Sequence, residues 1–237
     1  MGIKAQVPNT ITLLNLFSGC IALIFAFHQD FKLAFLFVCL GIFLDFFDGF
    51  FARLFKVSSP LGLQLDSLAD MVTSGVVPGV AMYYLMNQAL GFPSSGWQLF
   101  FPYLGFIITL GSCYRLANFN IDTRQTDSFI GLPTPANALF ILSLPLILLD
   151  NQYGFISQAL SNPLVLLVIS LFSAFMLNAE IPLFSLKVKS ASFAKNKLQI
   201  IFLVVSALLL VFFKALGIPL LILFYIALSV LTNKKSI

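Results

Sequence analysis

Eight apolar segments, most of them long enough to cross a lipid bilayer, follow one another along this chain of 237 residues. A transmembrane helix needs about 20 mainly apolar residues, with roughly 17 as the lower limit. We therefore expect an all-α integral membrane protein, a helical bundle of about eight transmembrane helices. Six segments fit when a residue or two of flank is allowed: Thr10–Phe27, Phe31–Arg53, Asp66–Leu90, Leu99–Asn118, Pro135–Leu149 and Asn162–Leu177.

The last two apolar segments, Leu198–Phe213 and Gly217–Leu231, are shorter, and Lys214 with a Leu-Gly-Ile-Pro turn separates them. They form either a hairpin through a thin bilayer or a partly re-entrant pair, and we favour eight spans. The chain shows no internal repeat, linker or low-complexity stretch. Residues 1–237 are therefore expected to form a single membrane domain.

Charged side chains are too few to cover a soluble protein of this size. They make up 9% of the residues, against about a quarter in soluble domains, and 59% of the residues are hydrophobic. Most of the surface must therefore face lipid. This composition excludes a soluble enzyme, a disordered chain, a disulfide scaffold and a nucleic-acid binder.

The lysines and arginines support an even number of spans, because cytoplasmic loops of membrane proteins carry the positive excess. With both termini placed in the cytoplasm, only Lys32 and Lys214 of the 13 lysines and arginines lie outside. The inner side then holds the other eleven: Lys4, Arg53, Lys56, Arg115, Arg124, Lys187, Lys189, Lys195, Lys197, Lys234 and Lys235.

Four aspartates, Asp45, Asp48, Asp66 and Asp70, lie within 26 residues at the predicted inner ends of the second and third spans. Ionisable residues in spanning segments are costly and indicate function by default. Helical spacing places Asp45 beside Asp48, and Asp66 beside Asp70. Two helices thus direct two carboxylates each to one point, where their charges repel unless cations neutralise them.

These carboxylates predict a metal site. Oxygen ligands without histidine or cysteine favour a hard divalent ion such as Mg²⁺, Mn²⁺ or Ca²⁺, and the chain's one histidine, His28, is expected at the opposite membrane face. Gly49 and Ala52 leave room for a bulky ligand, while Arg53 and Lys56 offset phosphate charge or simply anchor the helix. A paired-metal site at the membrane surface suits displacement at phosphorus. The alternative, solvated loop acids, suits one or two of the aspartates but not four at helical spacing.

The same residues form a motif with fixed spacings. It consists of Asp45-Phe-Phe-Asp48-Gly49-Phe-Phe-Ala52-Arg53, eight residues, Gly62, three residues, Asp66, three residues and Asp70. The motif resembles the signature of the CDP-alcohol phosphotransferase family at every defining position. That resemblance implies transfer of a substituted phosphate from a CDP-linked donor to an alcohol, with release of CMP.

The resemblance also implies a role for each signature residue. It implies that Asp45, Asp48 and Asp66 bind the metals, two Mg²⁺ or Mn²⁺ ions, and that Asp70 is the general base, also near the metal site. The CDP pocket is formed by Asp45, Asp48, Gly49, Ala52, Arg53, Gly62 and Asp66. The implied catalytic core is about residues 7–190, followed by a C-terminal hairpin of about residues 198–231.

Three further stretches resemble the membrane-type phosphatidylserine synthases within this family: Val7–Gly19, Tyr114–Asn120 and Gly131–Asn137. They imply CDP-diacylglycerol as donor, L-serine as acceptor, a homodimer and a prokaryotic inner membrane with the site facing the cytoplasm. Arg115 and Arg124 suit an acidic group, either the acceptor carboxylate or a lipid phosphate, or act as membrane anchors. Asn118 departs from the pattern, since many such synthases carry a basic residue there.

Other functions remain open from the sequence. The nearest is the same chemistry with another acceptor, such as glycerol 3-phosphate or an inositol compound, which would want more basic residues than the chain offers. From a different class, the acids would bind the cargo of a divalent-metal transporter, although transporters often have two related halves and the acids here lie only in the second and third spans. A catalytically dead membrane scaffold is the third.

Overall fold

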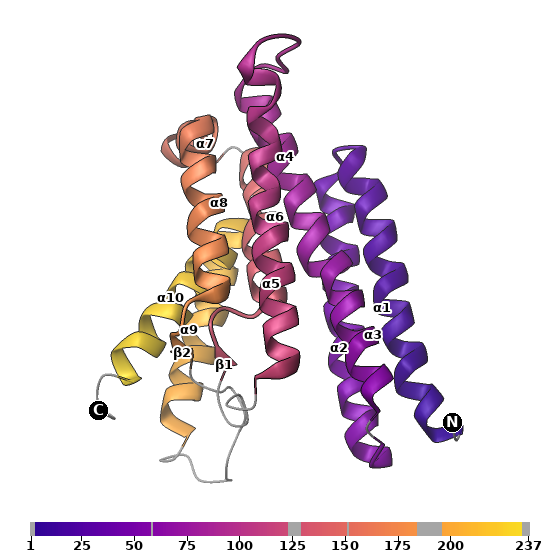
Figure 1. Cartoon of the computed structure of the whole chain (residues 1–237). Helices are drawn as coiled ribbons and strands as arrows, with labels where there is room; N and C mark the ends of the chain where they lie inside the picture. The colour runs from indigo at the N-terminus through magenta and orange to yellow at the C-terminus, as the bar shows by residue number, and fades with distance from the viewer. Residues whose placement is uncertain (1–2, 58, 123–128, 151, 184–195, 234–237) are drawn as a thin grey trace.

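The computed structural model describes residues 3–57, 59–122, 129–150, 152–183 and 196–233, and within these residues the fold is almost entirely helical. Figure 1 shows α1 (Ile3–Phe27) and α2 (Phe31–Phe55) as an antiparallel pair beside the helix that begins with α3 (Pro60–Asp70). That helix continues without a break through η1 (Met71–Val76), a π-helical segment, into α4 (Val77–Ala89).

The second half of the bundle begins with the 3₁₀ segments η2 (Trp97–Leu99) and η3 (Phe101–Phe106), which lead into α5 (Ile107–Ile121). The following elements are α6 (Thr134–Asp150), α7 (Gly154–Leu160), α8 (Pro163–Asn178), α9 (Lys197–Phe213), η5 (Lys214–Leu216) and α10 (Gly217–Asn233). Two short antiparallel strands, β1 (Phe129–Ile130) and β2 (Pro182–Leu183), pair Phe129 with Leu183. This strand pair is an addition to the expected all-α fold.

The expected integral membrane protein is confirmed, whereas the count of eight spans is met only in part. Among the described residues, five helices are long and apolar enough to cross a membrane, or six if the pair α7 and α8, bent by 80°, forms one span. The run Lys197–Thr232 counts once in this measure, and α6, with 17 residues, stands at the lower length limit. The number eight therefore stays a prediction.

Several helix bounds differ from those expected from hydropathy. The third helix begins at Pro60 rather than Asp66, because Ser59 caps it by accepting a hydrogen bond from the Gly62 amide (2.9 Å) and proline suits the first helical position. The expected break at Lys214 is present. Phe202 of α9 stacks on Phe224 of α10, with ring centroids 6.2 Å apart, so these helices fold back on each other.

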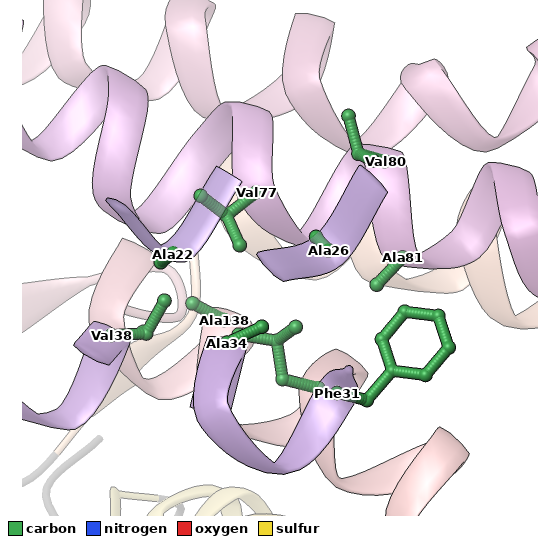
Figure 2. Packing of buried hydrophobic residues seen from close by; sticks show 10 residues of the cluster. Ala22, Ala26, Phe31, Ala34, Val38, Val77, Val80, Ala81 and Ala138 are labelled. Atoms are coloured by element: carbon green, nitrogen blue, oxygen red, sulfur yellow. The ribbon is translucent and has the colours of Figure 1, made fainter. Parts of the chain in front are cut away.

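Small buried side chains hold the first helices together. Figure 2 shows Ala22, Ala26, Ala34 and Ala81 packed with larger neighbours at the junction of α1, α2, α4 and α6. Without a hydrophobic driving force in lipid, helix association depends on such close approach. Large apolar side chains, among them Phe17, Phe43 and Phe46, lie on the outside instead, as expected for a surface covered by lipid.

Candidate active site between α1, α2, α3 and α5

Three of the four signature aspartates converge between the second half of α2 and the middle of α3. Asp45 and Asp48 project from the last turns of α2, and Asp66 projects from α3. One ligand oxygen from each of these three side chains lies within 4.8 Å of the other two. Asp48 is buried, and Asp45 and Asp66 are half-buried. Two consecutive helices, joined by a short turn, therefore supply one acidic cluster.

The fourth aspartate, Asp70, lies one turn further along α3 and is buried. Asn15 of α1 donates a hydrogen bond from Nδ2 to Asp70 Oδ1 (3.3 Å), and Thr73 donates from Oγ1 to Asn15 Oδ1 (2.9 Å). The π-helical segment begins directly after Asp70. Such segments widen the helix locally and occur frequently at functional sites. Asp70 is thus held by a chain of polar side chains inside an otherwise apolar bundle.

The first helix also contributes to the acidic cluster, through two polar residues that the sequence did not single out. Thr12 Oγ1 donates a hydrogen bond of 2.6 Å to Asp48 Oδ2, and both side chains are buried. Thr12 and Asn15 are polar residues three apart, so they share one face of an apolar span. That spacing was the signal that would have identified both residues.

A cavity of about 200 Å³ opens beside the aspartates, between α1, α2 and α3. It is lined by Pro8, Asn9, Thr12, Asp48, Gly49, Ala52, Val57, Ser59, Gly62, Leu63 and Asp66. A Cβ on Gly62 would lie 3.1 Å from Ser59 Oγ and 3.2 Å from Asn9 Oδ1, so any larger residue would crowd the wall. Most of the residues predicted for the nucleotide pocket therefore meet around one cavity.

Two residues of the predicted nucleotide pocket do not line this cavity, namely Asp45 and Arg53. Arg53 is exposed on the last turn of α2, and its Nη1 atom lies 3.4 Å from where a Cβ on Gly49 would stand. The guanidinium thus folds back over Gly49 at the edge of the cavity. Asp45 instead faces the carboxylate cluster.

Arg115 of α5 approaches the same centre from the other side. Its side chain is 8% exposed and lies within electrostatic reach of Asp70, and its guanidinium carbon stands 6.0 Å from the centre of the Phe119 ring. Asn118, one turn later, is exposed and borders a second cavity that Arg115 also lines. Arg124 lies outside the described residues.

The carboxylate cluster fits a hard divalent cation. Octahedral Mg²⁺ holds oxygen ligands at about 2.0–2.1 Å, so its ligands stand about 3–4 Å apart. The oxygens of Asp45, Asp48 and Asp66 lie within 4.8 Å of one another and need only a small adjustment to reach that spacing. Carboxylate oxygen is also the donor that such ions prefer. These three residues can therefore bind a divalent metal ion.

Comparison with known proteins places the chain in a family. The model of the CDP-alcohol phosphatidyltransferase family matches residues 5–176, and the chain belongs to this family. The match includes every signature residue from Asp45 to Asp70 and extends through α5 and most of α8. The resemblance inferred from the aspartate motif is thus confirmed.

Three similar relatives all carry the name CDP-diacylglycerol–serine O-phosphatidyltransferase. The relative from Helicobacter pylori (strain J99) is 36% identical over 151 residues, which are 63% of this chain and 60% of the relative. The relative from Bacillus subtilis (strain 168) is 34% identical over 142 residues, 58% of this chain and 74% of that protein. The archaeal relative from Methanocaldococcus jannaschii is 32% identical over 136 residues, 57% of this chain and 58% of that protein. The chain therefore matches about three fifths of the length of the Helicobacter relative.

Proposed function

We propose that this protein is a phosphatidylserine synthase that transfers the phosphatidyl group from CDP-diacylglycerol to the hydroxyl of L-serine and releases CMP. The observation that carries the proposal is the convergence of Asp45, Asp48 and Asp66 beside a cavity bordered by small residues. Family membership supports the CDP-linked donor, and the names of the relatives support serine as acceptor.

In this proposal the carboxylates of Asp45, Asp48 and Asp66 hold divalent ions, two Mg²⁺ or Mn²⁺, and Asp70, one turn further along α3, shares in the site. Bound ions of this kind neutralise the charge of a pyrophosphate and stabilise the leaving oxygen. Thr12 keeps Asp48 in position through its 2.6 Å hydrogen bond. Gly49, Ala52 and Gly62 leave space for the cytidine nucleotide, with Arg53 at the rim to meet a phosphate.

Asp70 acts as the general base in this proposal. Its carboxylate accepts the proton of the serine hydroxyl while Asn15 holds the side chain in position. The serine oxygen forms a bond to the phosphorus that carries diacylglycerol, the bond from that phosphorus to the oxygen of CMP breaks, and Asp70 later releases its proton to water. Positioning and charge neutralisation supply most of the rate enhancement in such a reaction.

Residues of α5 bind the acceptor in the same proposal. Arg115 lies within electrostatic reach of Asp70, so an acidic group bound to this guanidinium keeps an attached hydroxyl close to the base. Asn118 lies on the same helix and borders the same second cavity. We assign both residues to the acceptor side, and Arg124, by the sequence argument alone, to the acceptor or a lipid phosphate.

The proposed reaction is tested by CMP release from purified protein in detergent with CDP-diacylglycerol and Mn²⁺ or Mg²⁺. We expect release with L-serine, and at least about tenfold less with glycerol 3-phosphate or inositol, because a pocket built for one acceptor leaves buried polar groups unpaired with another. Release with glycerol 3-phosphate alone would keep the chemistry and change the acceptor. Metal uptake into vesicles without release of CMP would favour the transporter.

A smaller effect is expected when the hydroxyl that holds Asp48 is removed. Thr12→Val preserves the side-chain shape but removes the hydrogen bond to the carboxylate, and hydrogen bonds to charged groups contribute about 1.5–3 kcal/mol. We expect kcat/KM to fall about 10-fold or more, since 1.4 kcal/mol is a factor of ten. The control is Thr10→Val, which removes a hydroxyl on the exposed face of α1, and equal losses in both variants would contradict a role for Thr12.

The remaining features of the proposal concern the membrane. We propose eight spans with both termini and the aspartates on the cytoplasmic side of a prokaryotic inner membrane, in one domain with a core of about residues 7–190 and a hairpin of about 198–231. The excess of lysine and arginine at the aspartate end supports that orientation. Labelling from the outside of cysteines introduced at Lys32 and Lys214 tests this orientation.

A homodimer, implied by the family resemblance, is tested by the mass of the protein in detergent.

A further inference from the structure

A second polar cavity, of about 160 Å³, lies beside the proposed active site between α5, α8 and the strand pair. Figure 1 shows α5 and α8 side by side, and the two helices are in contact. The cavity is lined by Tyr114, Arg115, Asn118, Asp122, Ile130, Leu177, Asn178, Ala179 and Glu180. Arg115 thus lines this cavity and also interacts electrostatically with Asp70.

The Arg115 guanidinium has bonding capacity that the described part of the chain leaves unused. Its Nε and Nη2 atoms are buried and have no hydrogen-bond partner among the described residues. A buried charged donor without a partner is costly, and guanidinium donors match carboxylate oxygens in pairs. The contact with the Phe119 ring leaves the in-plane donors free for such a ligand. An anion in the cavity would satisfy them.

The wall that carries Glu180 is held in place by hydrogen bonds to backbone carbonyl groups. Asn178 donates from Nδ2 to the carbonyl oxygen of Gly111 (3.0 Å), which ties the end of α8 to α5. The Gly131 amide donates to the Ile181 oxygen (3.0 Å), and a Cβ on Gly131 would lie 2.6 Å from the Leu177 oxygen. The segment that carries Glu180 is therefore positioned before any ligand binds.

Two carboxylates, Asp122 and Glu180, line this cavity together with the one guanidinium. We propose that the cavity recognises the acceptor as a zwitterion, with Arg115 binding the carboxylate and Asp122 and Glu180 binding the ammonium group. A carboxylate has about four lone-pair sites, so it can accept an ammonium proton in addition to any bond within the protein. This inference rests on the proposed function and extends it from the general acceptor side to the groups that select an amino acid.

The charge of the lining explains the choice among acceptors. Among the described residues of the lining, two carboxylates accompany one guanidinium, and this favours a zwitterion over a phosphorylated acceptor, which brings up to two further negative charges. In the proposed arrangement, a carboxylate bound to Arg115 directs the hydroxymethyl group of serine toward Asp70. In this proposal Arg115 both selects the acceptor and orients its hydroxyl group for the reaction.

The test compares acceptors that each lack one charged group of serine. CMP release is measured with L-serine, with 3-hydroxypropionate, which has no ammonium group, and with ethanolamine, which has no carboxylate. We expect the unaltered protein to prefer serine to 3-hydroxypropionate by about 100-fold or more in kcat/KM. In Glu180→Gln and in the double variant Asp122→Asn with Glu180→Gln, this preference should fall at least about 10-fold, because the ammonium loses its charged partner.

The readouts separate recognition from damage to the structure. The preference for serine over ethanolamine, which reports on Arg115, and the KM for CDP-diacylglycerol should change less than about twofold in the acid variants. Asp150→Asn, an exposed acid at the end of α6, is the matched control and should leave every ratio unchanged. An unchanged preference for serine over 3-hydroxypropionate, or an equal loss with all three acceptors, would overturn the inference while leaving the proposed function standing. No release with serine in the unaltered protein would instead reject the proposed function itself.

Discussion

Asp70→Asn is expected to lower kcat for CMP release by about 10²–10⁴-fold, the usual contribution of a positioned general base. The amide has nearly the shape of the carboxylate but cannot accept the proton of the attacking hydroxyl. Because Asp70 lies outside the cavity that borders the nucleotide residues, the KM for CDP-diacylglycerol should change much less than kcat. Steady-state kinetics with serine held at saturation separates these two constants.

The control for this variant is again Asp150→Asn, which replaces an exposed acid and should keep full activity. Thermal unfolding in detergent should show that both variants remain folded. If Asp70→Asn retained activity within about tenfold of the unaltered protein, another group would accept the proton, because loss of a true base costs at least about 100-fold. The assignment of Asp70 would then be withdrawn.

Removal of divalent metal is expected to abolish CMP release, with a loss of at least about 10³-fold, since electrostatic stabilisation is usually the largest catalytic contribution. Added Mn²⁺ or Mg²⁺ should restore the rate. The physical reason is the triad of Asp45, Asp48 and Asp66, whose oxygens lie within 4.8 Å and repel one another without a cation. The measurement is the rate of CMP release after chelation, followed by titration with each metal.

Asp66→Asn provides the residue-level test of the same site. It removes one charged ligand from the triad, so the metal concentration needed for half-maximal activity should rise about tenfold or more. Substitution of Asp150, far from the triad, should leave this concentration unchanged. Full activity after thorough chelation would show that the carboxylates serve another purpose, and direct binding of Mn²⁺ to the unaltered protein would then be the deciding measurement.

Hydropathy alone was sufficient to predict the membrane class and the approximate positions of the helices. It was less reliable for their ends, because capping and proline placement at Ser59 and Pro60 lie outside an apolar window. It was also unreliable for the number of spans, since the 17-residue α6 stands at the length limit. The run Lys197–Thr232 is continuous in hydropathy although its two helices fold back on each other.

The aspartate motif allowed the family to be predicted, because catalytic chemistry constrains residue type and spacing more tightly than folding does. The juxtaposition of Asp45, Asp48 and Asp66 also followed from helical spacing and from the turn between two helices. Thr12 and Asn15 were different: their role depends on α1 lying against α2 and η1, a contact made by residues distant in the chain. A single sequence carries no direct record of such packing.

The sequence by itself determined that the protein lies in lipid, that it is helical and that its site is built from aspartates. Each of these properties depends on residue type and on spacing within a single helix or turn. Only the tertiary structure decided that Arg115, Asp122 and Glu180 line one second cavity. These residues come from α5 and from beyond the end of α8, more than 50 positions apart for Asp122 and Glu180. Their proximity is set by helix packing and by the Asn178 and Gly131 contacts, which act across the bundle rather than along the chain.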